Sequence, residues 1–289
     1  MKLEFYIVDV FAEEKFAGNQ LAVFRGGQEL TADEMQRIAR EMHFSETTFI
    51  QAETIRDGGF DVRIFTPAAE VPFAGHPTLG TAHILRTEIA PSIGESLTLN
   101  LQVGQIPVTF SNQVYWMKQI EPVFGQQIDL TRIAPVLGLS ADDIVPQFPI
   151  EQVSTGLPFI IVPVKNLDAL KRARVARDLY FDLIQKTWAK AILIFCDEPH
   201  QPQNNISVRM FADFFGVPED PATGSGNGCL AGYLAHHRFW GRDEIDVRAE
   251  QGYEIARPSL LYLQARESKG RIEISVGGKA ITIAKGEFV

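Results

Sequence analysis

Two segments of this chain, about 150 residues apart, carry the same short residue pattern. Glu70-Val-Pro-Phe-Ala-Gly-His-Pro-Thr-Leu-Gly-Thr-Ala-His-Ile-Leu85 aligns without a gap with Glu219-Asp-Pro-Ala-Thr-Gly-Ser-Gly-Asn-Gly-Cys-Leu-Ala-Gly-Tyr-Leu234, at an offset of 219 − 70 = 149. Just upstream, Val62-Arg-Ile-Phe65 matches Val208-Arg-Met-Phe211. Chance likeness between two Gly-rich turns is the alternative interpretation. Recurrence of the elements in the same order favours two homologous halves, each with a strand, a Gly turn and a helix.

Short strands dominate the pattern and helices interrupt them. Most apolar runs are brief, rich in β-branched or aromatic residues, and often alternating, which is typical of strands in an α+β protein. Thr31–Arg40 opens with Thr31 and has Glu34 three residues later, a capping-box signature. Helices are predicted over Thr78–Arg86 and Gly228–Arg238, each after a Gly-containing turn. With 289 residues, two domains are expected, divided near the Pro- and Gly-containing stretch Glu121–Thr131, which gives domains 1–120 and 130–276.

Composition excludes several classes of function. The net charge is −9 and no basic patch stands out, so nucleic acid is not an expected partner. No run approaches the roughly 18 apolar residues that span a membrane, and the N-terminal segment lacks the apolar core of a signal peptide. A cytoplasmic location is therefore expected. Cys196 and Cys229 share no metal or redox spacing and are predicted to be reduced and buried.

No metal site is predicted from the histidines. There is no His-Glu-x-x-His pattern. His43, His83 and His200 are interpreted as surface or helix histidines. The Gly-rich run at Gly224–Gly228 breaks the dinucleotide pattern, because Cys229 stands where its last Gly belongs.

The repeated turn has the chemistry of an anion site. A Pro precedes a Gly turn that leads into a helix, and the first turn of a helix has unpaired backbone N–H groups at the positive end of its dipole. Such a helix start binds a carboxylate without a metal or cofactor. If the halves pack about a pseudo-twofold axis, both helix starts face one cleft between the domains, where small-molecule sites prefer to form. The alternative is that the glycines only allow tight turns.

Side chains near these turns provide the candidates for acid–base chemistry. The first turn offers His76, and the second offers Asp220, Thr223 and Ser225. Glu46 precedes the apolar, β-branched strand predicted over Thr47–Gln51, where partial desolvation is expected to raise its pKa toward the range of a general acid or base. Simpler interpretations remain open: an exposed Glu at the start of a strand, a helix N-cap for Asp220, and a turn histidine for His76.

The quoted residues also resemble a known family. Asp9-Val-Phe11 with Gly18-Asn19, Ser45-Glu-Thr-Thr-Phe49, Phe73-Ala-Gly-His-Pro-Thr-Leu-Gly80, Glu219-Asp-Pro-Ala-Thr-Gly-Ser225 and Gln251-Gly252 with Arg257-Pro-Ser259 occur in the order found in the PhzF-like (phenazine-biosynthesis isomerase) family, within the diaminopimelate-epimerase-like superfamily. This resemblance covers essentially the whole chain. It implies two pseudo-symmetric domains, each a curved, mostly antiparallel sheet around a central helix, with the active site in the cleft between them. It also implies that 277–289 joins the first domain, that the protein is a homodimer, and that it needs no cofactor.

The resemblance implies roles for individual residues. Glu46 is similar to the family's proton-shuttling acid/base, and His76 and Asp220 to the residues that flank it. Asn19, Gly75, Thr223, Gly224 and Ser225 are implied to bind substrate. The related amino-acid epimerases have a cysteine before each Gly turn; Ala74 and Thr223 stand there in this chain, which excludes two-thiol racemisation.

Together these features predict a cofactor-independent isomerase that moves a proton between carbons of a small cyclic or amino-acid-like carboxylate. Two alternatives stay open: another single-carboxylate epimerase or tautomerase, and a non-catalytic member of the fold that binds a small ligand.

Overall fold

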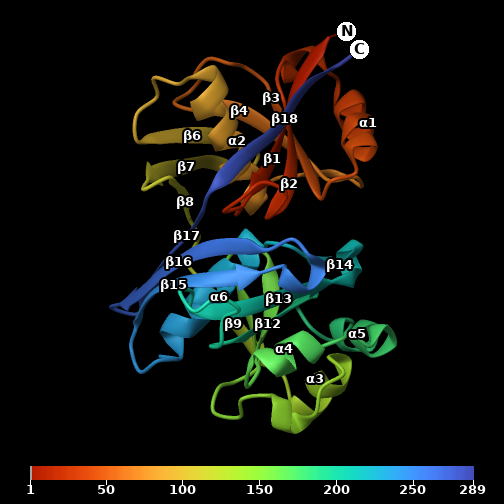
Figure 1. Cartoon of the computed structure of the whole chain (residues 1–289), viewed down its shortest axis with the longest axis vertical. Helices are drawn as coiled ribbons and strands as arrows, with labels where there is room; N and C mark the ends of the chain where they lie inside the picture. The colour runs from red at the N-terminus through yellow and green to blue at the C-terminus, as the bar shows by residue number, and fades with distance from the viewer. Residues whose placement is uncertain (1) are drawn as a thin grey trace. The chain divides into compact units, whose positions relative to one another are not determined.

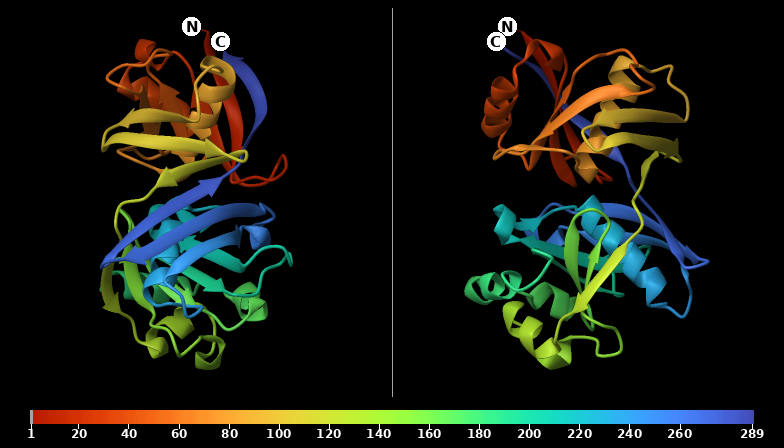
Figure 2. Two further views of the ribbon diagram at one scale, coloured as in Figure 1. Left: turned by 90° about the vertical axis from the view of Figure 1, so that its left-hand side faces the viewer. Right: turned by 180° about the vertical axis from the view of Figure 1, so that it is seen from behind.

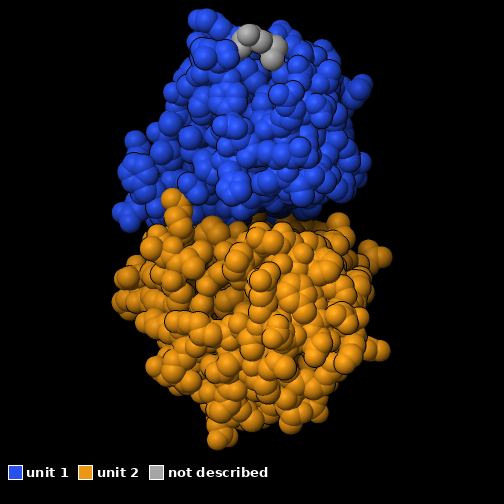
Figure 3. All heavy atoms as spheres, turned by 90° about the vertical axis from the view of Figure 1, so that its right-hand side faces the viewer, with its two compact units in different colours: residues 1–118, 277–289 blue, residues 119–276 orange. Residues whose placement is uncertain are grey.

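The computed structural model describes residues 2–289, so Met1 of the N-terminal segment lies outside the described part. The chain forms two compact units, residues 1–118 with 277–289 (unit 1) and residues 119–276 (unit 2), coloured separately in Figure 3. Within residues 2–289, no helix has both the length and the apolar character that crossing a membrane requires.

Unit 1 is built on one continuous series of paired strands (Figure 1). The order is β18-β1-β2-β3-β4-β6-β7-β8, with β2–β3 and β4–β6 parallel and the other neighbours antiparallel. The short β5 pairs antiparallel with the end of β4. In both views of Figure 2 the C-terminal strand β18 runs beside the N-terminal β1, its antiparallel partner. The strands are β1 (Leu3–Val10), β2 (Asn19–Phe24), β3 (Glu46–Ile50), β4 (Phe60–Phe65), β5 (Glu70–Val71), β6 (Ser96–Leu101), β7 (Gly104–Ser111), β8 (Val114–Lys118) and β18 (Ala280–Phe288).

Unit 2 repeats this order with its own strands. The series is β9-β10-β11-β12-β13-β15-β16, with β11–β12 and β13–β15 parallel and the short β14 paired with β13. β17 follows β16 after a two-residue turn, Lys269–Gly270, with positive φ at both residues, as type I′ hairpins require. The strands are β9 (Val123–Gln127), β10 (Glu151–Ser154), β11 (Pro158–Pro163), β12 (Ala191–Cys196), β13 (Ile206–Ala212), β14 (Val217–Asp220), β15 (Glu244–Gln251), β16 (Ser259–Ser268) and β17 (Arg271–Gly278).

Strand order and strand direction thus coincide between the units, in line with the sequence repeat. The stretch Glu121–Thr131, near which the sequence places the domain boundary, contains a strand that the sequence did not predict. Val123–Gln127 forms β9 and pairs with β10, as β18 pairs with β1 in unit 1. Alternation is weak in β9, so its pattern gave no strand signal.

Within residues 2–289, six α-helices accompany the strands. They are α1 (Ala32–Met42), α2 (Gly75–Ile84), α3 (Leu130–Val136), α4 (Leu167–Arg172), α5 (Arg177–Ile184) and α6 (Gly224–His236), and the five-residue π-helix η2 (Leu85–Ile89) continues α2. The capping box predicted at α1 is confirmed, since the Thr31 side chain accepts a hydrogen bond from the Glu34 N–H and the Glu34 carboxylate accepts one from the Thr31 N–H.

The helices α2 and α6 are almost entirely buried, one in each unit. Because they contact apolar side chains on all sides, small residues are needed where strands approach. At Gly80, for example, a Cβ atom would lie only 2.5 Å from Leu21 Cδ2 and 2.8 Å from Val10 Cγ2. Both helices begin three to four residues before the predicted Thr78 and Gly228. Pro and Gly residues suggested turns there, whereas they form the first helical turns, where Pro is tolerated and tertiary packing overrides propensity.

The two cysteines are free and buried, as predicted. His43 is exposed at the end of α1 and His83 lies in α2, which agrees with their interpretation.

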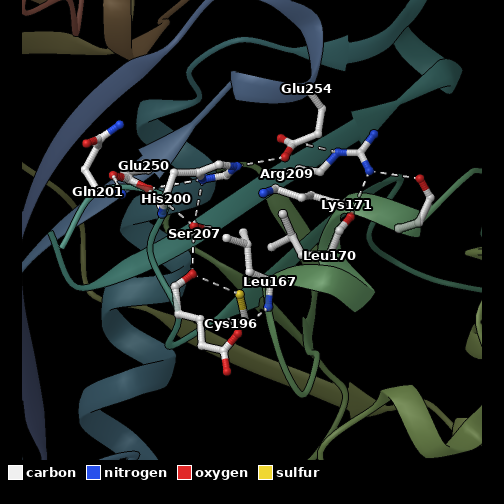
Figure 4. Close-up of polar contacts among 12 residues, drawn as sticks. Leu167, Leu170, Lys171, Cys196, His200, Gln201, Ser207, Arg209, Glu250 and Glu254 are labelled. Atoms are coloured by element: carbon white, nitrogen blue, oxygen red, sulfur yellow. Dashed lines mark hydrogen bonds and ion pairs between the residues drawn. The ribbon is translucent and has the colours of Figure 1, made fainter.

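The interpretation of His200 as a surface or helix histidine is wrong. Its ring nitrogens lie 3.1 Å from Glu250 Oε2 and 3.0 Å from Glu254 Oε1, in a buried polar cluster of unit 2 (Figure 4). Burial alone lowers the pKa of His200, but hydrogen bonds to the two carboxylates outweigh it and raise the pKa to about 9. The imidazolium therefore neutralises charge that would be costly to bury unpaired.

Candidate active site

Glu46 is the first residue of β3 and lies at the start of a buried strand. It pairs in parallel register with Leu21 of β2, and the four residues that follow it in β3 are buried. Its own side chain is 19% exposed. The strand therefore holds the Glu46 carboxyl group in a place that is largely shielded from water and still accessible.

His76 is the second residue of α2 and faces Glu46. Its Nε2 atom lies 3.5 Å from Glu46 Oε2, and the His76 side chain is 7% exposed. Burial lowers the pKa of His76 to about 3, against the opposing effect of a hydrogen bond with the Gln20 backbone. The contact is therefore one between a carboxyl group and a neutral imidazole, which can either donate or accept a proton.

The first turn of α2 has no side-chain cap. Ala74 is the N-cap residue and offers no hydrogen-bonding side chain, and Gly75 begins the helix in a buried position. Asn19, also buried, begins β2, two residues before the residue that pairs with Glu46. Unit 1 thus brings together four of the predicted residues, Asn19, Glu46, Gly75 and His76, around the starts of β2, β3 and α2.

Unit 2 brings the other predicted residues together around the start of α6. Asp220 ends β14 and is 8% exposed. Thr223 is the N-cap residue of α6, yet its side chain does not cap the helix and instead donates a hydrogen bond to Asp220 Oδ2. Gly224 begins α6 in a buried position, and Ser225 is partly exposed beside it.

Gln251 joins this group, and sequence reasoning assigned it no role. This buried residue ends β15. Its Nε2 donates to Asp220 O (2.8 Å) and to Thr223 Oγ1 (3.1 Å). Its Oε1 accepts from Thr223 N (3.2 Å) and from Asn227 Nδ2 (2.8 Å). A single Gln at a strand end has no periodic signal, so only the Gln-Gly pair in the family pattern could have pointed to it.

The two units are not chemically equivalent. Leu21 pairs with Glu46 in unit 1, and the corresponding pair in unit 2 is Phe159 with Ala191. Alanine thus stands where unit 1 has its carboxyl group. In the aligned turns, Val71 and His76 of unit 1 correspond to Asp220 and Ser225 of unit 2. The two units therefore have different side chains at equivalent positions of the repeat.

Residues 2–289 include no group of three or more His, Cys, Asp or Glu side chains arranged to hold a metal ion.

The strand order shared by the two units, with a buried helix beginning at a Gly turn in each, defines a protein of the mixed α+β class. The family model for phenazine biosynthesis-like proteins (PhzC-PhzF) matches residues 8–286. The chain therefore belongs to the PhzF family, and it is an isomerase of that family.

Three relatives illustrate the match. An uncharacterized isomerase of Pasteurella multocida is 35% identical, covering 98% of this chain and 93% of the relative. The trans-2,3-dihydro-3-hydroxyanthranilate isomerase of Pseudomonas aeruginosa is 33% identical over 98% of both chains. The crystal structure of a Bacillus anthracis phenazine biosynthesis protein of the PhzF family has a TM-score of 0.92 at 27% identity, covering 100% of this chain and 99% of that one.

Proposed function

We propose that this isomerase moves a proton between two carbons of a small cyclic or amino-acid-like carboxylate, with Glu46 as the acid/base. The observation that carries the proposal is the contact between Glu46 Oε2 and His76 Nε2, at 3.5 Å. A carboxyl group in this partly shielded position, beside a neutral imidazole, is suited to both removing and returning a proton at neutral pH.

The proposed reaction needs one base and no redox step. Glu46 takes a proton from one carbon of the substrate, and the electron pair of that C–H bond shifts into the adjacent π system. The protonated Glu46 then delivers the proton to a second carbon on the same face, which leaves a double bond in a new position. The neutral His76 orients the Glu46 carboxyl group and stabilises its two protonation states in turn. The atoms of the substrate are conserved, so the reaction is an isomerisation and calls for no cofactor.

Binding of the substrate carboxylate is assigned to the helix starts. Neither Ala74 before α2 nor Thr223 before α6 caps its helix with a side chain. The first backbone N–H groups of each helix can therefore donate hydrogen bonds to a bound anion. We assign Asp220 to the catalytic residues of the reaction and Ser225 to substrate binding. Two-thiol racemisation is not proposed, because Ala74 and Thr223 stand where that chemistry needs cysteines.

The choice of substrate class is supported by a relative. The Pseudomonas aeruginosa relative is named for trans-2,3-dihydro-3-hydroxyanthranilate, a cyclic amino acid. That compound is the first substrate to test here, together with other small cyclic and amino-acid carboxylates. The homodimer implied by the family resemblance stays a prediction.

Deuterium incorporation tests the proposal. The protein is incubated in D2O with each compound, and deuterium uptake and double-bond migration are followed by NMR. Glu46→Gln keeps the shape of the side chain but cannot transfer a proton, so we expect the exchange rate to fall at least about 100-fold, the scale of general acid–base catalysis. Glu41→Gln, on the exposed face of α1, is the matched control and should exchange like the unaltered protein.

The outcomes separate the alternatives. Exchange at a single carbon without double-bond migration would favour an epimerase or tautomerase. Compound binding without exchange, equal in Glu46→Gln and the unaltered protein, would favour a ligand-binding protein. Exchange that persists in Glu46→Gln would overturn the assignment of the base.

A further inference from the structure

Two backbone groups determine which atoms of the Gln251 side chain donate hydrogen bonds and which accept them. The backbone oxygen of Asp220 can only accept, so the group facing it at 2.8 Å must be the Gln251 N–H donor. The Thr223 backbone N–H can only donate, so the group facing it at 3.2 Å is the Gln251 oxygen. These two contacts set the orientation of the Gln251 amide independently of any side-chain partner.

This orientation in turn fixes the Thr223 hydroxyl group. Gln251 Nε2 also lies 3.1 Å from Thr223 Oγ1, and because Nε2 is a donor, Oγ1 must accept there. The single hydroxyl hydrogen of Thr223 is left to point elsewhere, and the Asp220 carboxylate oxygen Oδ2 lies within hydrogen-bond distance. The amide thus directs the Thr223 proton at the Asp220 carboxylate.

Gln251 is itself held rigidly. Asn227, fully buried in α6, donates to Gln251 Oε1 at 2.8 Å and to Thr223 O at 3.0 Å. The preceding residue, Glu250, accepts hydrogen bonds from His200 N and Gln201 N (Figure 4). It also accepts one from Asn204 Nδ2, in the same loop between β12 and β13. The end of β15 is therefore fixed on both of its faces. A buried amide with all its hydrogen-bonding positions used loses little further entropy when it orders its neighbours.

We propose that Gln251 is a positioning residue for the isomerase reaction, which acts through Thr223 to hold the Asp220 carboxylate in one orientation. This inference rests on the proposed function for its catalytic consequence, since Asp220 must serve the reaction. Its structural part, the orientation of Asp220, stands independently of activity. The equivalent turn of unit 1 has Ala74 in place of Thr223 and Val71 in place of Asp220, so this relay belongs to unit 2 alone.

Gln251→Glu is the sharpest single test. The substitution preserves the shape of the side chain but replaces the Nε2 donor with an acceptor, which repels Asp220 O and draws the Thr223 proton away from Asp220. We expect kcat to fall about 10- to 100-fold, the effect of a displaced catalytic group, while KM changes about threefold or less. Gln152→Glu is the matched control, because Gln152 is also buried and its amide binds only backbone groups, Gln126 O and Ala189 N. It is expected to keep kcat within about twofold.

Variants of Thr223 test the relay when Gln251→Glu folds poorly. Thr223→Val removes the hydroxyl group and should lower kcat as Gln251→Glu does, whereas Thr223→Ser should restore it. Because both changes break one relay, the double variant Thr223→Val/Gln251→Glu should lose no more activity than either single variant. Fully additive losses, or an equal loss in Gln152→Glu, would overturn the proposal.

A crystal structure of Gln251→Glu separates this proposal from the proposed function. We expect the Asp220 carboxylate to rotate away from Thr223 in this variant and to keep its place in Gln152→Glu. An unmoved Asp220 would overturn the positioning role even if activity fell. If instead Asp220 moves while Glu46→Gln still exchanges deuterium, the positioning role stands and the assignment of the base fails.

Discussion

At the scale of single residues, the proposed reaction depends on the protonation state of His76. The imidazole has almost no access to water, and α2 and β3 place it against a carboxyl group. In the native protein its pKa of about 3 keeps it neutral at physiological pH. A permanently protonated His76 would instead form an ion pair with Glu46 and hold that carboxylate in its charged form, which would hinder the proposed use of Glu46 as a base that then becomes an acid.

We expect the His76 ring to show no titration between pH 5 and 8. In NMR spectra of the native protein, the His76 ring resonances should keep constant shifts over this range, because protonation of the buried ring sets in only near pH 3. The signals are assigned by their loss in His76→Asn. The same ring in urea-unfolded protein should titrate near the ordinary value of about 6.5. A native inflection between pH 6 and 7 would contradict the neutral state of His76.

The same difference in pKa links His76 to stability. Below about pH 6.5 the unfolded chain binds a proton at His76 that the native state refuses, so the free energy of unfolding falls as the pH drops. His76→Asn should therefore lose less stability than the unaltered protein between pH 6.5 and 4.5, as measured by urea unfolding at each pH.

Sequence reasoning at this scale found the residues but not their contacts. Glu46 stood out because a carboxyl group precedes an apolar strand, and His76 because it lies in a Gly-Pro turn. Their approach to 3.5 Å depends on how α2 packs beside the start of β3, which no local pattern records. Gln251 was missed for the same reason, since its partners precede it by 24 to 31 residues.

At the scale of elements, the repeat places the same ion pair in both units with different surroundings. Arg63 of β4 binds Glu70 of β5 through two hydrogen bonds of 2.7 Å, and Arg209 of β13 binds Glu219 of β14 through two of 2.8 Å. The Arg63 side chain is 29% exposed, whereas Arg209 is only 4% exposed. Arg209 also donates to the backbone oxygens of the α4 end, at Leu170 and Ala173.

We expect Arg209→Met to destabilise the protein far more than Arg63→Met. Removing Arg209 takes the guanidinium away from the Glu219 carboxylate and from the backbone oxygens at the end of α4, a loss of about 3–5 kcal/mol. Removing Arg63 leaves Glu70 in contact with water, so a loss of about 1 kcal/mol is expected. Chemical denaturation of both variants at neutral pH measures the difference. Equal losses would show that the two pairs serve the same structural purpose despite their different burial.

The element scale also shows where prediction from sequence succeeds. The Val-Arg-x-Phe and Glu-x-Pro matches marked the two ion-paired hairpins, and the shared strand order follows from the same repeat. The starts of α2 and α6 were placed too late because Gly and Pro favour turns in isolation, whereas burial on every side makes helix the better solution there. Strand β9 was missed because two of its five residues are glutamines and its pairing partner β10 lies more than 20 residues away.

At the scale of the whole molecule, the two units differ in how many segments of the chain form them. Unit 2 is one continuous segment with its own core of buried aliphatic and aromatic residues around α3, α4, α5 and β11–β13. Unit 1 requires both chain ends, because β18 pairs along the length of β1 and Phe288 lies 5.3 Å from Phe5 and 5.2 Å from Phe24 between ring centroids. The two units should therefore differ in their ability to fold from a single piece of chain.

We expect residues 119–276 to fold alone and residues 1–118 to fail. The first segment retains its complete strand series and core, so it should show dispersed NMR signals and a cooperative unfolding transition. The second lacks β18, which exposes the ladder of β1 and removes Phe288 from the aromatic cluster with Phe5 and Phe24. Joining 277–289 to the N-terminus of 1–118 through a flexible linker should restore folding, because it returns β18 to β1.

Isolated 119–276 should keep the hydrogen bonds among Asp220, Thr223 and Gln251 yet catalyse no deuterium exchange, since Glu46 and His76 belong to the other unit. Exchange by 119–276 alone would contradict the proposed reaction, and cooperative folding of 1–118 would show that β18 is dispensable to its unit.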